Sequence, residues 1–214
     1  MNLEFPPRLV EVASSIRSRL EDGLEPTLYY HGVHHTFDDV LPAVDRIARG
    51  EGVVAVDREI LLAAAIFHDV GFLERYNGNE AIGARYAAEI LPAYGFSSPE
   101  IERVLDLILA TELREVEGVM LQVPGADLLK RILCDADLDN LGREDFFQVS
   151  ENLRREIEEH GRKLNDIEWY SRQVLFVSQH RWFTGTQTRQ RQARKERNLH
   201  ELRSILARAA SPEA

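Results

Sequence analysis

The stretch that decides the fold is LLAAAIFHDVG, at residues 61–71. Seven consecutive apolar residues, from Leu61 to Phe67, are typical of a buried helix, and His68 and Asp69 follow them directly. A buried imidazole or carboxylate costs free energy unless another group satisfies it. Taken alone, the pair could be a hydrogen-bonded cap at the end of the helix or a pair of metal ligands.

Two other segments concentrate the same side-chain chemistry. Residues 30–36 read YHGVHHT, and residues 134–139 read CDADLD. Imidazole and carboxylate groups drawn from three separate segments form the ligand set of a catalytic divalent-metal site. The sequence therefore predicts a metal ion that acts on water.

Length and composition predict one sizeable domain. The 214 residues are 44% apolar, so a single domain spanning 1–214 can bury a substantial core. No apolar run approaches the roughly 18 residues of a membrane-spanning helix, and residues 1–7 lack the basic and apolar regions of a signal peptide. Cys134 is the only cysteine, which excludes an internal disulfide and is typical of a reducing compartment. We expect no membrane contact and a cytoplasmic location.

The net charge of −10 is unevenly distributed along the chain. Residues 180–208 carry eight arginines and lysines against two glutamates, whereas residues 1–179 carry 18 basic against 33 acidic side chains. This acidic body disfavours a nucleic-acid surface. The basic segment either pairs with the acidic body or supplies arginines to a phosphate-bearing ligand.

The hydrophobic pattern is helical almost throughout, and we predict an all-α, compact bundle. Thr36 is the predicted N-cap of the second helix. The best candidate for a strand is residues 53–56, and it is short. The predicted helices are 9–20, 37–49, 57–69, 80–91, 98–111, 126–141, 144–162, 166–182 and a basic helix after residues 184–186.

The order and spacing of four residues resemble the pattern of the HD superfamily of metal-dependent phosphohydrolases. The matching residues are His35, His68, Asp69 and Asp137, and the resemblance covers about 28–145. It implies an HD-type helical bundle whose four residues bind one divalent ion, either Mn, Fe, Co, Ni, Zn or Mg. The remaining residues, about 146–210, would form a C-terminal helical extension.

A finer match concerns the histidines upstream. The run Tyr30-His31-x-x-x-His35 resembles the signature of cyclic-nucleotide phosphodiesterases, with Gly32 in place of an asparagine. This resemblance implies that His31 is the general acid, while His35 binds the metal. Asp69 would orient or deprotonate the attacking water.

The sequence departs from the dinuclear members of the superfamily at two places. Where those members have additional histidines, this chain has Asn79 and Thr111. Neither is a good ligand for a second ion, so we expect a single metal. The absence of a second ion also disfavours an iron-dependent oxygenase of the HD type.

The resemblance implies hydrolysis of a small phosphorylated substrate, a nucleotide or cyclic nucleotide in the first place. Lys130, Arg143 and Arg181 are candidate phosphate contacts, although each could equally be a surface charge. The alternative function is a non-catalytic regulatory module that binds metal or nucleotide. A homodimer is a possible oligomeric state of the chain.

Overall fold

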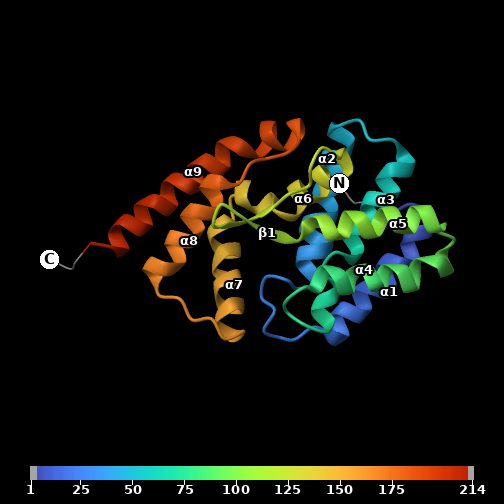
Figure 1. Ribbon diagram of the computed structural model, residues 1–214, viewed down its shortest axis with the longest axis horizontal. Helices are drawn as coiled ribbons and strands as arrows, with labels where there is room; N and C mark the ends of the chain where they lie inside the picture. The colour runs from blue at the N-terminus through green and yellow to red at the C-terminus, as the bar shows by residue number, and fades with distance from the viewer. Residues whose placement is uncertain (1–3, 212–214) are drawn as a thin grey trace.

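The computed structural model describes residues 4–211 and confirms the all-α class (Figure 1). Nine α-helices lie in the described part of the chain, together with one small antiparallel hairpin of strands β1 and β2. The elements are α1 (Pro7–Gly23), α2 (Leu41–Gly50), α3 (Ala55–Phe67), α4 (Asn79–Ile90), α5 (Ser98–Ile108), β1 (Leu113–Val116), β2 (Val119–Gln122), α6 (Leu128–Asp137), α7 (Phe146–Glu159), α8 (Asp166–Gln179) and α9 (Gly185–Ala209).

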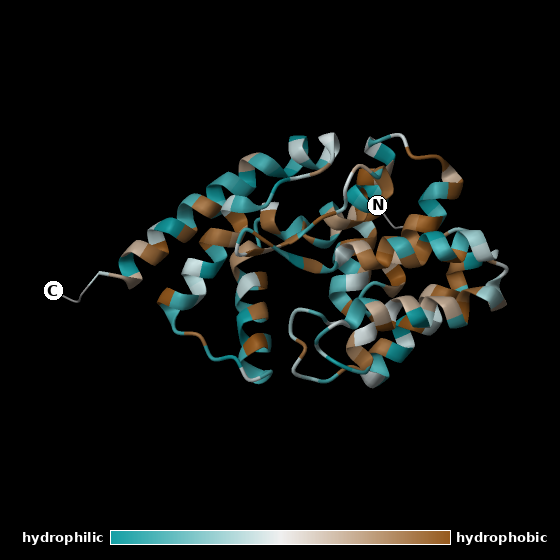
Figure 2. Ribbon diagram, in the orientation of Figure 1, coloured by the Kyte–Doolittle hydropathy of each residue, from teal (hydrophilic) through white to brown (hydrophobic). Residues whose placement is uncertain are grey.

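Helix α3 is the centre of the N-terminal bundle. Every residue from Ile60 to Phe67 is buried, because α1, α2, α4, α5 and α6 all pack against this helix. The uninterrupted apolar run therefore reflects a helix enclosed on all sides, unlike the one-sided apolar stripe of a surface helix. Figure 2 shows the same contrast between the apolar bundle helices and the largely hydrophilic α9.

The C-terminal helices α7, α8 and α9 form a second group beside this bundle (Figure 1). Helices α8 and α9 pack against each other, and a separate hydrophobic cluster lies among the C-terminal elements. This cluster consists of Leu141, Phe146, Val177, Trp182 and Leu202. We call residues 146–210 the C-terminal extension.

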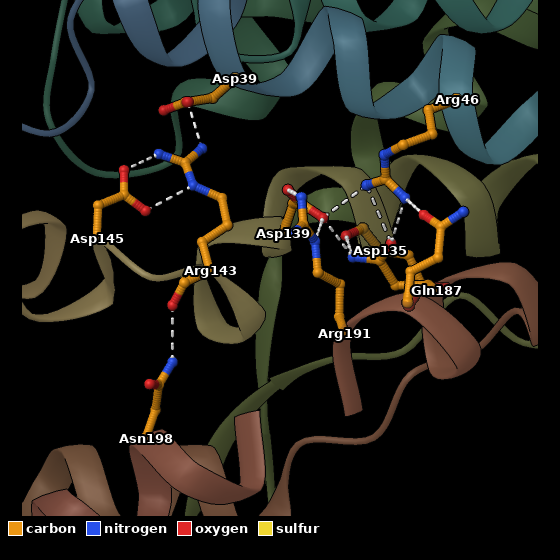
Figure 3. Close-up of polar contacts among 10 residues, drawn as sticks. Asp39, Arg46, Asp135, Asp139, Arg143, Asp145, Gln187, Arg191 and Asn198 are labelled. Carbon is orange, nitrogen blue, oxygen red and sulfur yellow. Dashed lines mark hydrogen bonds and ion pairs between the residues drawn. The ribbon is translucent and has the colours of Figure 1, made fainter. Parts of the chain in front are cut away.

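A polar network joins the extension to the bundle (Figure 3). The carboxylate of Asp139 accepts a hydrogen bond from Arg46 of α2 at 2.7 Å and two from Arg191 of α9, each at 2.7 Å. Gln187 of α9 donates to the same carboxylate at 2.8 Å. At this contact the basic segment pairs with the acidic body, which is one of the two roles expected from its charge.

A second buried carboxylate holds the turn before α9. Asp135 of α6 accepts hydrogen bonds from the backbone amides of Phe183 and Thr184 at 2.9 and 2.8 Å, and from the Thr184 hydroxyl at 2.6 Å. The Thr184 hydroxyl in turn caps α9 by accepting from the Gln187 amide. The carboxylate of Asp135 therefore stabilises the turn before α9.

Two local predictions are wrong. Residues 53–56 form no strand, since α3 begins at Ala55; the strands lie at 113–122 and are joined by Glu117 and Gly118, both with positive φ. Thr36 caps no helix, because it lies inside a π-helical turn, His35–Val40, that runs directly into α2. Of the described helices, none is both long and apolar enough to cross a membrane.

Candidate metal centre

Four side chains that are distant in the sequence converge at one point. The Nε2 atom of His35 lies 3.1 Å from Oδ1 of Asp137 and 3.6 Å from Oδ2 of Asp69. The Nε2 atom of His68 lies 3.2 Å from Oδ2 of Asp69 and 3.6 Å from Oδ1 of Asp137. The structure thus brings together all four residues that the sequence predicts as metal ligands.

Each of these residues lies at the end or the start of a helical element. His35 opens the π-helical turn, His68 follows α3, Asp69 precedes a short 3₁₀ turn, and Asp137 ends α6. The Nδ1–H of His68 donates to the Ala65 carbonyl at 2.8 Å, which leaves Nε2 for the centre.

A close helix contact fixes the end of α3. A Cβ atom at Gly83 of α4 would lie 2.4 Å from the carbonyl oxygen of Phe67 and 3.1 Å from that of His68. Only a glycine allows α4 to approach α3 this closely at the metal centre.

The donor set fits a divalent metal ion. His68 Nε2 and Asp69 Oδ2 are buried, and neither has a hydrogen-bond partner among the described residues. Such unsatisfied groups are costly in a folded protein, and a shared cation would satisfy both. Two imidazoles with two carboxylates suit Mn, Fe, Co, Ni or Zn, and the carboxylates also allow Mg.

The electrostatics keep Asp137 ionised, as metal binding requires. Burial alone would raise the pKa of its carboxyl group. The hydrogen bond from His35, together with the positive charge of the His35 and His68 imidazoles, outweighs burial and holds that pKa below its usual range. In addition, Gln122 of β2 donates to Oδ2 of Asp137 at 2.6 Å, so the hairpin helps to orient this ligand.

His31 lies beside the four ligands and is held by a residue of the extension. Its Nδ1 and its backbone amide both bond to the carboxylate of Glu156 in α7, which is fully buried. The Glu156 carboxylate also accepts from the Tyr30 amide at 2.8 Å and from the Tyr76 hydroxyl at 3.0 Å. Glu156 was not predicted from the sequence, because it is one of several glutamates in α7 and only the fold shows its burial.

The carboxylate of Glu156 favours the protonated form of His31. Burial alone would lower the pKa of the imidazole, but the hydrogen bond to Glu156 and the negative charges of Asp69, Glu156 and Asp137 together outweigh it, and the pKa is raised above its usual value. His31 is thus positioned and charged as a general acid would be.

A cavity of about 690 Å³ opens beside the centre. His31, Asp69 and Asp137 line it, and both the bundle and the extension contribute to its walls. Its size is within the range of small-molecule sites.

The comparison with protein families agrees with this geometry. The family model of the HD domain matches residues 39–140. This segment is an HD domain. It contains His68, Asp69 and Asp137, whereas His35 lies four residues before the first matched residue.

A solved structure has a similar fold over nearly the whole chain. It is a predicted HD superfamily hydrolase from an uncultured Thermotogales bacterium, with 19% sequence identity and a TM-score of 0.62. The similarity covers 95% of this chain and 94% of that one, so it includes the extension as well as the HD domain. None of the curated proteins compared with the chain matches it.

The two positions at which dinuclear members have histidines also line the cavity of this HD domain. The Thr111 hydroxyl is engaged, since it donates to the Ile108 carbonyl at 2.8 Å. Asn79 is buried, and its Oδ1 has no partner among the described residues. Neither residue adds an imidazole, and the expectation of a single ion stays a prediction.

The structure does not bring the three predicted phosphate contacts to the HD domain's metal centre. Lys130 pairs with Asp106 at 2.6 Å, and Arg143 is held between Asp39 and Asp145 (Figure 3). Arg181 is exposed and lines a separate cavity of about 270 Å³ in the extension. Lys130 lies on α6 and Arg143 on the loop after it, and ion pairs with acidic neighbours neutralise the charge of both.

Proposed function

We propose that the chain is a metal-dependent phosphohydrolase that hydrolyses esters of phosphate. One observation carries this proposal: His35, His68, Asp69 and Asp137 converge beside a cavity that His31, Asp69 and Asp137 line. The similar fold of a predicted HD superfamily hydrolase supports it.

In the proposed reaction, the metal ion and the side chains of the protein have different roles. When bound by the four ligands, a divalent ion lowers the pKa of a coordinated water from about 15.7 towards about 7 and polarises a phosphoryl oxygen. Asp69, at the cavity wall, orients the attacking water and accepts its proton. His31 donates a proton to the departing oxygen, and Glu156 stabilises the charged imidazole before the reaction.

The substrate carries a single phosphate group under this proposal. A small nucleotide monophosphate or a cyclic nucleotide, as the sequence resemblance implies, meets this condition. The cavity has room for a molecule of this size.

The test replaces Asp69 and follows hydrolysis of p-nitrophenyl phosphate after removal of metal and addition of Mn²⁺. Asp69→Asn should lower kcat by at least about 100-fold, since the same residue binds metal and handles the proton. Asp57→Asn is the matched control, because Asp57 is exposed in the first turn of α3, and this change should leave kcat unchanged. Full activity of the chelated protein, or of Asp69→Asn, would contradict the proposal.

A further inference from the structure

The cavity beside the metal centre is poor in positive charge. Four carboxylates line it, those of Asp69, Glu80, Glu112 and Asp137. Arg162 is the one lysine or arginine among its lining residues, and it is exposed. A divalent ion would offset two of the carboxylates, and a phosphate group could then bind next to the ion and His31. A chain of several phosphates would find few protein cations to pair with beyond Arg162 and the His31 imidazole, which line the cavity.

Three arginines of the polar network pair with carboxylates that do not line the cavity. Arg143 pairs with Asp39 and Asp145, and Arg46 and Arg191 both pair with Asp139 (Figure 3). Releasing any of them would leave a carboxylate without its partner, which is costly for Asp139 because it is buried. The low positive charge of the cavity is therefore a stable property of the fold.

Three aliphatic residues of α7 form one part of the wall that the extension contributes, next to Phe146, Ser150, His160, Arg162, Gln173 and Phe176. Val149, Leu153 and Ile157 recur along α7 at spacings of four residues, so they lie on one face of the helix, and all three line the cavity. All three are half-buried, so that face is not covered by the rest of the chain. We call these three residues the α7 strip.

The strip lies on the side of the cavity where the leaving group would be. Glu156 lies between Leu153 and Ile157 in α7 and holds His31, which is the group that protonates the departing oxygen. On the other side, the Phe72 ring stacks on the His31 imidazole, with 4.2 Å between the ring centroids. The organic part of an ester that places its bridging oxygen at His31 therefore meets apolar side chains.

We propose that the substrate is a phosphate monoester of an apolar alcohol, whose hydrocarbon part packs against the α7 strip. This inference rests on the proposed phosphohydrolase function and narrows its substrate class. A hydrocarbon group gains free energy from leaving water, and the sparse positive charge at the site suffices for one phosphate. At the α7 strip, the polar sugar and base of a nucleoside would lie against aliphatic carbon, whereas a hydrocarbon group would bury no polar atoms there.

The test measures binding of butyl-, hexyl- and octylphosphonate, which cannot be hydrolysed, to the Mn²⁺-loaded protein by calorimetry. The Kd should fall by roughly twofold to fourfold for each added methylene, as expected when it leaves water. Octylphosphonate should bind more tightly than adenosine monophosphate. A Kd that does not change with chain length, or tighter binding of adenosine monophosphate, would overturn the inference.

Two variants of α7 locate the effect. Leu153→Ala should reduce the gain in affinity from butyl- to octylphosphonate by about fivefold or more, because it removes the contact surface of the strip. Glu151→Ala is the matched control, since Glu151 is exposed on the same helix, and it should keep the full gain. If Leu153→Ala does not fold by circular dichroism, Ile157→Ala replaces it with the same expectation. An undiminished gain in the folded strip variant would contradict the assignment of the strip.

Turnover separates this inference from the proposed function. Hydrolysis of p-nitrophenyl phosphate tests the phosphohydrolase activity, whereas the dependence of Kd on chain length tests the apolar site. Turnover without that dependence would overturn the substrate class alone. If the Kd depends on chain length but neither p-nitrophenyl phosphate nor octyl phosphate is hydrolysed, the chain has an apolar phosphonate site. That result would refute the enzymatic function.

Discussion

Glu156 contacts His31 across 125 residues of sequence, from a helix outside the HD domain. Its carboxylate binds both the imidazole Nδ1 and the backbone amide of His31. The candidate acid is therefore held by the extension, while the candidate metal ligands belong to the bundle. Activity should depend on both parts of the chain.

Glu156→Gln keeps the size of this side chain and removes its charge. The pKa of His31 should fall, because the hydrogen bond and the charge of Glu156 are among the interactions that raise it against the effect of burial. His31 would then lose its proton at lower pH, so the alkaline limb of the kcat profile should move to lower pH. We expect kcat at neutral pH to drop by roughly 10- to 100-fold, less than the roughly 100- to 10,000-fold contribution of general acid catalysis, because the imidazole itself is retained.

The matched control for this change is Glu159→Gln, at an exposed position of the same helix. Its pH profile should coincide with that of the unaltered protein. An unchanged alkaline limb in Glu156→Gln would refute the role of Glu156 in holding the His31 proton.

Removal of metal should lower the free energy of unfolding. A ligand that binds only the folded state stabilises it by about 2.7 kcal/mol at a concentration 100 times its Kd. Urea unfolding with and without Mn²⁺ measures this difference. Asp137→Asn should abolish most of it, whereas Asp106→Asn, which alters a surface partner of Lys130, should retain it. Equal stabilisation of Asp137→Asn by Mn²⁺ would place the ion elsewhere.

Asp139→Ala should loosen the extension from the bundle. Arg46 and Arg191 would both lose their carboxylate partner. We expect a loss of about 2 kcal/mol in the free energy of unfolding, less than the roughly 3–5 kcal/mol of a fully buried pair, because the two guanidinium side chains are 30% and 29% exposed. Asp145→Ala removes a partly exposed carboxylate and should cost less than about 1 kcal/mol. Chemical unfolding of both variants decides between these values.

His180 should make the stability of the extension depend on pH. Burial, and secondarily the nearby charge of Lys195, lower the pKa of its imidazole to about 3, and neither ring nitrogen has a partner among the described residues. In the unfolded chain the same group titrates near pH 6.5. Between these values only the unfolded state takes up the proton, so stability is complete above about pH 6.5 and decreases as the pH falls towards 3.

The measurement compares urea unfolding at pH 7.5 and pH 5.5. The unaltered protein should lose about 1 kcal/mol more on acidification than His180→Phe does. His200→Gln, at an exposed position of α9, should behave like the unaltered protein. The same acid sensitivity in His180→Phe would show that other groups cause it.

The helices and the four candidate ligands could be predicted from the sequence because their signals are local or strongly patterned. The uninterrupted apolar run at residues 61–67 is typical of a buried helix, and the four candidate ligands match a known pattern. The hairpin was missed because its strands are four residues long, and β1 is fully exposed, so no buried alternation marks it.

The residues that act through tertiary contacts could not be predicted. Glu156 and Gln122 are polar residues in ordinary surroundings, and only the fold shows that one bonds to His31 and the other to Asp137. For the same reason, Lys130 and Arg143 were expected at the site because they lie near the acidic cluster in sequence, whereas Asp106 and Asp39, which pair with them, come from other segments.

Helix α7 thus separates two properties that many enzymes combine in one set of residues. Its glutamate supports proton transfer, and its aliphatic carbons select what is cleaved. Exchanging the three residues of the strip for polar ones could retune selectivity towards sugar-like esters while the cation and its ligands stay intact. The substrate selectivity of such a protein can then change by single substitutions in the α7 strip, while the metal ligands stay unchanged.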